Sequence, residues 1–178
     1  MQASTFWKII TMDQANLLEK LIALLNDHGI QYCAIGGQAV NAYVEPLVSL
    51  DLDLVVDLHQ LDRVEKLLSK HFTLKKYPHS LNIALLGSDL RVQIQTDERY
   101  GEFIKRAVRR NVLGHEIPVA SLEDVLQGKI WAVQDQERRG SKRLKDLADI
   151  ARLLEQYPDL RGQVPRGIQA RLVDDAMD

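Results

Sequence analysis

The stretch that decides the fold reads IGGQAV at residues 35–40, and DLDL follows it at residues 51–54. A short apolar segment, 31–35, precedes the glycine pair and a short helical pattern follows it, so the pair marks a strand-to-helix turn. Two glycines there let backbone N–H groups approach a phosphate closely, at a helix N-terminus that favours anions. The pattern predicts a phosphate-binding turn at Gly36 and Gly37, although such a turn is also a common structural device.

The second stretch carries two carboxylates on one predicted strand, 50–56. Asp51 and Asp53 point to the same face because side chains alternate along a strand. Neighbouring carboxylates repel each other unless a cation lies between them, and Mg²⁺ (or Mn²⁺) with a triphosphate is the natural occupant. The alternative is a solvated face of an edge strand. The two stretches together, in this order and spacing, are more specific than either alone.

Working outward, hydrophobic periodicity and turn residues predict an α+β fold, with a mixed sheet flanked by helices and a helical C-terminal part. We expect an α/β core over 1–120, helices over 121–160 that pack on it, and a tail over 161–178. Further strands are predicted at 81–86 and 90–95, and a hairpin at 112–119. Helices are predicted at 13–28, 61–72, 98–110, 121–136 and 142–156.

Composition narrows the function classes. The 178 residues are 46% hydrophobic and 27% charged, with a net charge of −2, which excludes disordered and fibrous architectures and a globally basic nucleic-acid binder. The single cysteine, Cys33, excludes an intramolecular disulfide and a multi-cysteine zinc site. Residues 1–10 lack a signal-peptide pattern, and no apolar run could span a bilayer, so we expect a cytoplasmic protein without a membrane partner.

The glycine pair followed by Asp-x-Asp resembles the signature of the nucleotidyltransferase superfamily that includes DNA polymerase β. Within it, the sequence is most similar to the AbiEii-like branch of small bacterial nucleotidyltransferases, some of which are toxins of toxin–antitoxin systems. VASLED at 119–124 with Gly128-Lys129 resembles one helix motif of that branch, and KRLKDLADI at 142–150 resembles another. The resemblance covers about residues 17–155.

The resemblance implies a nucleotidyltransferase-like fold and a reaction. Asp51 and Asp53 would hold Mg²⁺ (or Mn²⁺) and bind the triphosphate of an NTP, and the Gly36-Gly37 turn would hold its β- and γ-phosphates. A hydroxyl of an RNA or protein acceptor would attack the α-phosphate, and pyrophosphate would leave. An antitoxin is an implied partner. The remaining implied residues are Lys129 at the phosphates, Asp146 orienting a cation or the nucleophile, and Ser49 and Lys145 at the nucleotide.

Two departures from the family pattern suggest an alternative. Gln93 stands where relatives commonly carry a third carboxylate, and a neutral amide is neither a general base nor a strong Mg²⁺ ligand. Asp97, farther along, could substitute for it. Val48-Ser49-Leu50 replaces an Arg-x-Thr that precedes the pair in many relatives. The alternative hypothesis is therefore a catalytically degenerate nucleotide- or partner-binding module, and a third is an antitoxin-like structural role.

Basic residues gather in two segments. If both faced one cleft, they would hold an RNA or a nucleotide; otherwise they are solvated faces. The two groups are Lys105, Arg106, Arg109 and Arg110, and then Arg138, Arg139, Lys142, Arg143 and Lys145.

Overall fold

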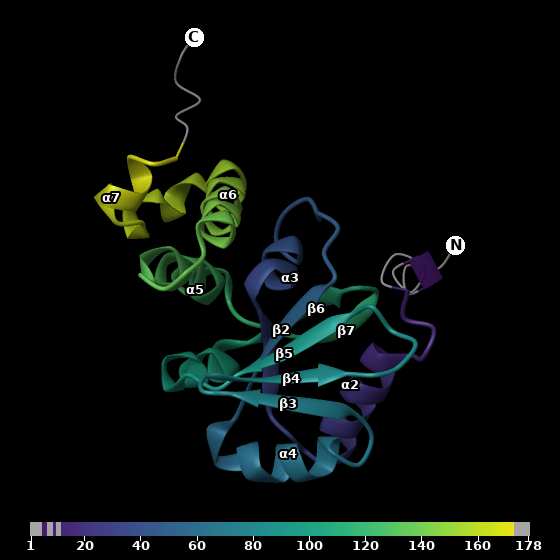
Figure 1. Ribbon diagram of the computed structural model, residues 1–178. Coiled ribbons are helices and arrows are strands. Elements are labelled where there is room, and N and C mark those ends of the chain that lie inside the picture. Colours follow the sequence, from purple (N-terminus) through teal and green to yellow (C-terminus); the bar gives the residue numbers. More distant parts are fainter. Residues whose placement is uncertain (1–4, 7–8, 10–11, 173–178) are drawn as a thin grey trace. The chain divides into compact units, whose positions relative to one another are not determined.

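The computed structural model describes residues 5–6, 9 and 12–172 (Figure 1). The other residues include most of the stretch inspected for a signal peptide and the last part, 173–178, of the predicted tail, and both lie outside the described residues. The chain forms two compact units, Met1–Ser121 and Leu122–Asp178. Among the described helices, none has the length and apolar character needed to cross a membrane.

The first unit is built on a mixed sheet of seven strands in the order β3-β4-β5-β2-β1-β7-β6. The two central strands, β1 and β2, run antiparallel, whereas β2 is parallel to β5 and β1 is parallel to β7. This arrangement confirms the predicted α+β class. The strands are β1 (Tyr32–Ile35), β2 (Asp51–Val56), β3 (Thr73–Tyr77), β4 (Ser80–Ala84), β5 (Arg91–Gln95), β6 (Val108–Val112) and β7 (His115–Val119).

Helices connect these strands and bury one of the sheet's faces. Helices α2 and α4 contact each other, and their leucines contribute to the core of the unit. On β2 the apolar Leu52 and Leu54 are buried, while Asp51 and Asp53, which alternate with them, are only half-buried. The helices of this unit are α2 (Leu17–Asp27), α3 (Gly36–Asn41), η1 (Leu58–Gln60), α4 (Leu61–Leu68) and η2 (Glu98–Arg106).

The start of α2 differs from the predicted one in an informative way. The helix predicted from residue 13 begins instead at Leu17, yet the carboxylate of Asp13 accepts hydrogen bonds from the backbone N–H groups of Leu17 and Leu18 at 2.7 and 3.2 Å. Asp13 is 2% exposed, so these bonds satisfy a buried carboxyl group as well as the helix end. The cap therefore acts from farther away than a standard capping residue.

Both edges of the sheet depart from the sequence-based expectation. Strand β3 was not predicted, and the predicted helix 98–110 is a 3₁₀ helix, η2, that ends before strand β6. The two strands lie at opposite edges, and most of their side chains are exposed. An exposed edge strand lacks the apolar alternation by which strands are recognised. Lys75 and Lys76 on β3 are typical of edges protected against pairing with another chain.

The hairpin between β6 and β7 was predicted around Gly114 and is confirmed. Leu113 and Gly114 both have positive φ, 52° and 86°, as the two central residues of a type I′ turn require. The strands predicted at 81–86 and 90–95 are present as β4 and β5, and they pair antiparallel with Ser80 opposite Gln95.

The second unit is helical. Helices α5 (Leu122–Gln134) and α6 (Gly140–Gln156) contact each other along their length, and η3 (Pro158–Gln163) and α7 (Arg166–Gln169) follow. Val164 and Ile168, within the predicted tail, are 3% and 5% exposed, so these residues belong to the apolar core of the unit. The Gln169 amide donates to the carbonyl groups of Arg161 and Val164 and fastens this last turn.

Candidate functional site

The turn between β1 and α3 needs a glycine at its first position for two reasons. Gly36 has φ +68°, a left-handed conformation that L side chains rarely adopt. A Cβ at this position would also overlap the carboxylate of Asp53 and lie 3.2 Å from the Cβ and Cγ atoms of that residue. The backbone of the turn thus lies directly against the second aspartate. Helix α3 begins at Gly36, within the glycine pair rather than after it as predicted, because Gly36 turns the chain straight out of β1.

Gly37 differs from its neighbour. A Cβ built there meets no atom within 4 Å, and its φ is not in the left-handed region. The space beside Gly37 is therefore open, and neither packing nor backbone conformation demands a glycine there. The one property that a side chain would remove is close access to the backbone N–H groups, which is what a bound phosphate requires.

Asp51 and Asp53 lie on one face of β2, and the strand register gives each a different neighbour on β5. Asp51 is opposite Arg91, and Arg91 Nε lies 2.8 Å from Asp51 Oδ1. The two side chains are 43% and 70% exposed, so this ion pair is worth at most about 1 kcal/mol and breaks easily. Asp53 lies between Ile35 on β1 and Gln93 on β5.

The residues around Asp53 contain no third carboxylate on β5. Gln93 occupies the position opposite Asp53, as the sequence comparison with the family pattern suggested. Asp97 does not stand free to replace it, because its carboxylate caps η2 at Arg99 N and binds the Arg99 guanidinium at 2.6 Å. Hydrogen bonding to Arg99 lowers the pKa of Asp97. Asp97 is therefore engaged in a local structural role.

The loop from α3 to β2 is fastened by two amide side chains that the sequence did not single out. Gln38, 2% exposed, donates from Nε2 to the Ser49 carbonyl at 2.9 Å. Asn41 donates to the Leu47 carbonyl at 2.7 Å and accepts from the Leu47 N–H at 3.0 Å. Ser49 Oγ in turn accepts from the backbone N–H of Asp51 at 3.3 Å. The signal available in the sequence was a Gln that stands between the glycine pair and the apolar Ala39 and Val40.

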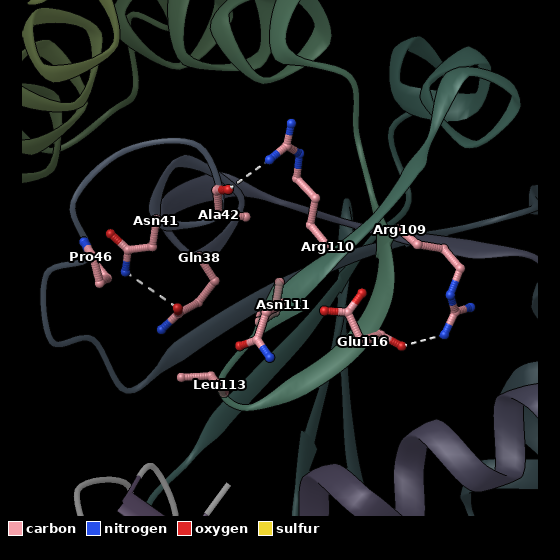
Figure 2. A pocket seen from close by; sticks show the side chains of 10 residues that line it. Gln38, Asn41, Ala42, Pro46, Arg109, Arg110, Asn111, Leu113 and Glu116 are labelled. Carbon is pink, nitrogen blue, oxygen red and sulfur yellow. Dashed lines mark hydrogen bonds between the residues drawn. The ribbon is translucent and has the colours of Figure 1, made fainter. Parts of the chain in front are cut away.

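A pocket of about 480 Å³ lies beside this loop, within the first unit. Figure 2 shows Gln38 and Asn41 of α3 on one side of it, with Asn111 and Glu116 of the β6–β7 hairpin on the other. Arg110, one of the clustered basic residues, stacks on Tyr43 with 3.9 Å from its Cζ to the ring centroid. It also donates to the Ala42 carbonyl. This arginine is thus part of the local packing.

In the second unit, Lys129 of α5 and Asp146 of α6 form an ion pair within a larger cluster of charged side chains. Lys129 Nζ lies 2.9 Å from Asp146 Oδ1 and 2.7 Å from Asp149 Oδ2. Arg138 binds Asp146, and Arg152 binds Asp149, at 2.8 and 2.9 Å. Both carboxylates and Lys129 are buried.

Burial of Lys129 disfavours its charged form, but the two carboxylates outweigh that penalty. The pKa of the Lys129 ammonium is therefore raised above its ordinary value, and the lysine is charged at every physiological pH. Lys145, which precedes Asp146 in α6, is exposed. Asp149 had not been assigned a role from the sequence, and Arg138 had been considered only as a member of the second basic group.

The structure thus brings Gly36, Asp53 and Gln93 together and places Asp51 and Ser49 beside them through β2 and its preceding loop. The three other predicted residues, Lys129, Lys145 and Asp146, lie in the second unit.

Solved structures share this fold. The antibiotic-resistance factor ANT(2'')-Ia has a TM-score of 0.60 and 12% identity, with 90% of this chain and 94% of that chain covered. The lincosamide antibiotic adenylyltransferase LnuA, bound to lincomycin, has a TM-score of 0.52 and 13% identity, with 76% and 95% covered. An antigenic nucleotidyltransferase-like protein from Paracoccidioides brasiliensis has a TM-score of 0.53 and 19% identity, with 95% and 84% covered. At these identities the likeness shows the fold alone.

A sequence profile gives the family. No curated protein sequence matches the chain. The family described as nucleotidyl transferase AbiEii toxin, type IV TA system, matches residues 55–177. This segment begins after Asp53, so the match is independent of the glycine and aspartate motifs that first suggested a nucleotidyltransferase. Fold, motifs and profile agree: the chain belongs to the AbiEii family of nucleotidyl transferase toxins.

Proposed function

We propose that this chain binds a nucleoside triphosphate together with a divalent cation at Gly36, Gly37, Asp51 and Asp53, and transfers the nucleotidyl group to an acceptor hydroxyl. The observation that supports the proposal best is the contact between the Gly36 backbone and the Asp53 carboxylate. It joins a turn that is open for a phosphate at Gly37 to a pair of carboxylates on one strand face. The turn suits the phosphates of a nucleoside triphosphate, and the carboxylate pair suits the cation that the triphosphate carries.

The donor set fits magnesium or manganese. Carboxylate oxygens are the ligands that both hard cations favour, and Mg²⁺ is often held by one or two carboxylates together with substrate phosphates. Within the described residues there is no cluster of three or more His, Cys, Asp or Glu side chains that could hold a metal. Asp51 and Asp53 would therefore share the cation with the triphosphate. A bound cation would neutralise charge on the phosphates and polarise the reacting one.

The protein's own residues position the phosphates of the nucleotide and neutralise part of their charge. The open backbone at Gly37 is available to the phosphates, and Ser49 Oγ holds the N–H of Asp51 at the start of β2. Gln93 cannot accept a proton, but its amide can orient a group beside Asp53. For the second unit by itself, we propose Lys129, Asp146 and Lys145 as the charged residues through which it takes part in the reaction.

Calorimetric titration tests this proposal. The wild type is titrated with each of the four NTPs, with Mg²⁺ or Mn²⁺ and with EDTA. We expect cation-dependent binding that Asp51→Ala and Asp53→Ala each abolish. Asp57→Ala is the matched control, since Asp57 follows β2 directly and its carboxylate accepts only a local bond from His59 N. Equal binding by wild type and Asp53→Ala would contradict the assigned site.

The acceptor is approached by a separate experiment. Labelled NTP is incubated with the protein and with either an RNA pool or a protein extract, and label transferred to one pool identifies the class. We place this reaction in the bacterial cytoplasm, with an antitoxin as the expected partner of the toxin.

A second candidate function is supported by two observations. Gln93 faces Asp53, and Asp51 is already paired with Arg91, so the site has few acidic groups for a cation. A chain with this site would bind a nucleotide or a partner without catalysis. Gln93→Asp separates the two: a gain of Mn²⁺ affinity and of label transfer supports a degenerate site, while a loss of transfer shows that Gln93 belongs to a working one.

A further inference from the structure

One positively charged side chain lies in register with the aspartates of the first unit. Strands β2 and β5 are parallel neighbours in the sheet (Figure 1), and Arg91 lies directly opposite Asp51. Because side chains alternate along a strand, Arg91 shares the face of the sheet that carries Asp51 and Asp53. The other described residues assigned to this site are neutral or acidic, namely Gly36, Gly37, Ser49, Asp51, Asp53 and Gln93.

A triphosphate at this site needs a positive side chain beside it. The phosphates keep a net negative charge after one divalent cation is bound, and they lie beside two carboxylates that repel them. Arg91 is within reach of them, because a residue diagonally opposite on a neighbouring strand is about 8 Å away from Cα to Cα, a distance that an extended arginine spans. The guanidinium of Arg91 can therefore reach the space between Asp51 and Asp53 as well as Asp51 itself.

The present partner of Arg91 holds it weakly. Arg91 Nε lies 2.8 Å from Asp51 Oδ1, and the two side chains are 70% and 43% exposed. An ion pair this exposed is weak and is readily given up for a better one. Nη1 and Nη2 of Arg91 have no hydrogen-bond partner among the described residues. These two nitrogens present the planar donor fork that suits a phosphate.

We propose that Arg91 is a triphosphate-binding residue that exchanges partners when the nucleotide binds. Its guanidinium pairs with Asp51 in the free protein and donates to the phosphates when Asp51 becomes a ligand of the cation. The exchange leaves no charge without a partner, because Asp51 gives up an arginine for a cation and Arg91 gives up a carboxylate for a phosphate. The inference rests on the proposed function and adds to it a residue of β5 that the sequence motifs did not indicate.

Titrations with Mn²⁺ alone and with nucleotide test the exchange, because Arg91 acts on the two affinities in opposite directions. Arg91→Gln should raise the affinity for Mn²⁺ alone about two- to fivefold, since Asp51 loses a competing partner. The same substitution should lower the affinity for NTP in saturating Mn²⁺ about tenfold, the effect of one charge-assisted contact. Inorganic triphosphate with Mn²⁺ should show the same loss as NTP. Arg91→Lys should bind NTP with intermediate affinity, because it keeps the charge but loses the planar fork.

Arg63→Gln is the matched control, since Arg63 is an exposed arginine on α4 of the same unit. It should change both affinities by less than about twofold, and both Gln variants should melt close to the wild type. For Arg91→Gln, a rise in both affinities, a fall in both, or an unchanged affinity for NTP or for inorganic triphosphate overturns the inference.

The Asp53→Ala titration separates this inference from the proposed function. Loss of NTP binding in Asp53→Ala, together with wild-type NTP affinity in Arg91→Gln, would refute the partner exchange and leave the proposed function standing. A wild type that binds no NTP with Mn²⁺ would overturn both.

Discussion

Gly36→Ala is the substitution that most directly tests how the site is built. Two costs follow from the structure. An alanine at φ +68° pays roughly 1–2 kcal/mol for the left-handed conformation. Its Cβ would also overlap the Asp53 carboxylate, and overpacking of this kind typically costs about 1–3 kcal/mol. We expect a loss of about 2–5 kcal/mol in the free energy of unfolding.

The neighbouring glycine is a matched control for this substitution. Gly37→Ala introduces the same methyl group into a position with open space and without positive φ. Because Gly37 lies within α3, an alanine there is expected to leave stability unchanged or to raise it by up to about 1 kcal/mol. The two adjacent substitutions should thus differ by several kcal/mol, although the chemical change is identical.

A double-mutant cycle separates the two costs of Gly36→Ala. Asp53→Ala removes the carboxylate that the new methyl group meets, while the backbone cost stays. In the Asp53→Ala background, Gly36→Ala should cost at least about 1 kcal/mol less than in the wild type, because contacting residues couple by 0.5–3 kcal/mol.

Urea titrations followed by far-UV circular dichroism supply the measurement, with m-values compared to confirm that the same unfolding step is observed. If Gly36→Ala proved no more destabilising than Gly37→Ala, the described turn would be wrong. If the cycle showed no coupling, the described contact between Gly36 and Asp53 would be contradicted, whereas the left-handed conformation of Gly36 would not be.

Three further predictions concern charged groups. Arg91→Ala should change stability by less than about 1 kcal/mol, because the pair is exposed, but should raise Mn²⁺ affinity by freeing Asp51, as calorimetry would report. Asp13→Ala should lower the free energy of unfolding by about 0.5–2 kcal/mol through loss of the α2 cap, measured in urea. Lys129→Met should cost about 3 kcal/mol in urea, because buried carboxylates lose a partner. The pKa of Lys129 is raised in the folded state, so its contribution to the free energy of unfolding is complete below the unfolded-state pKa of about 10.4. That contribution disappears as the pH rises through the folded-state pKa. Thermal melts of wild type and Lys129→Met should therefore converge only at high pH.

The sequence predicted those parts of the fold that depend on local patterns. The β1 strand, the glycine turn and the alternation of Asp51 and Asp53 are local, and the structure contains all three. Strands β3 and β6 were missed or shortened because edge strands bury few side chains. Their position at the sheet's edges follows from strand order, which one sequence does not reveal.

The less predictable parts of the site depend on register between strands that are distant in the chain. Arg91 meets Asp51 because β2 and β5 are parallel neighbours, with two other strands between them in sequence. The roles of Gln38 and Asn41 depend on the path of the loop they hold. Asp149 lay in a recognised motif, yet its contact with Lys129 emerges only when α5 and α6 pack together.

The register between β2 and β5 also bears on how the cation would arrive. Asp51 faces Arg91 and Asp53 faces Gln93, so the two carboxylates meet one positive and one neutral side chain instead of further acids. Little negative charge is left to hold a free cation, but an incoming triphosphate meets correspondingly little repulsion. We therefore expect cation and nucleotide to bind together. Mn²⁺ titrations followed by electron paramagnetic resonance should show weak binding to the protein alone and at least tenfold tighter binding with NTP present, the coupling expected when the phosphates complete the ligand set. Tight binding of Mn²⁺ without nucleotide would show that Asp51 and Asp53 suffice on their own and that Arg91 does not compete for Asp51.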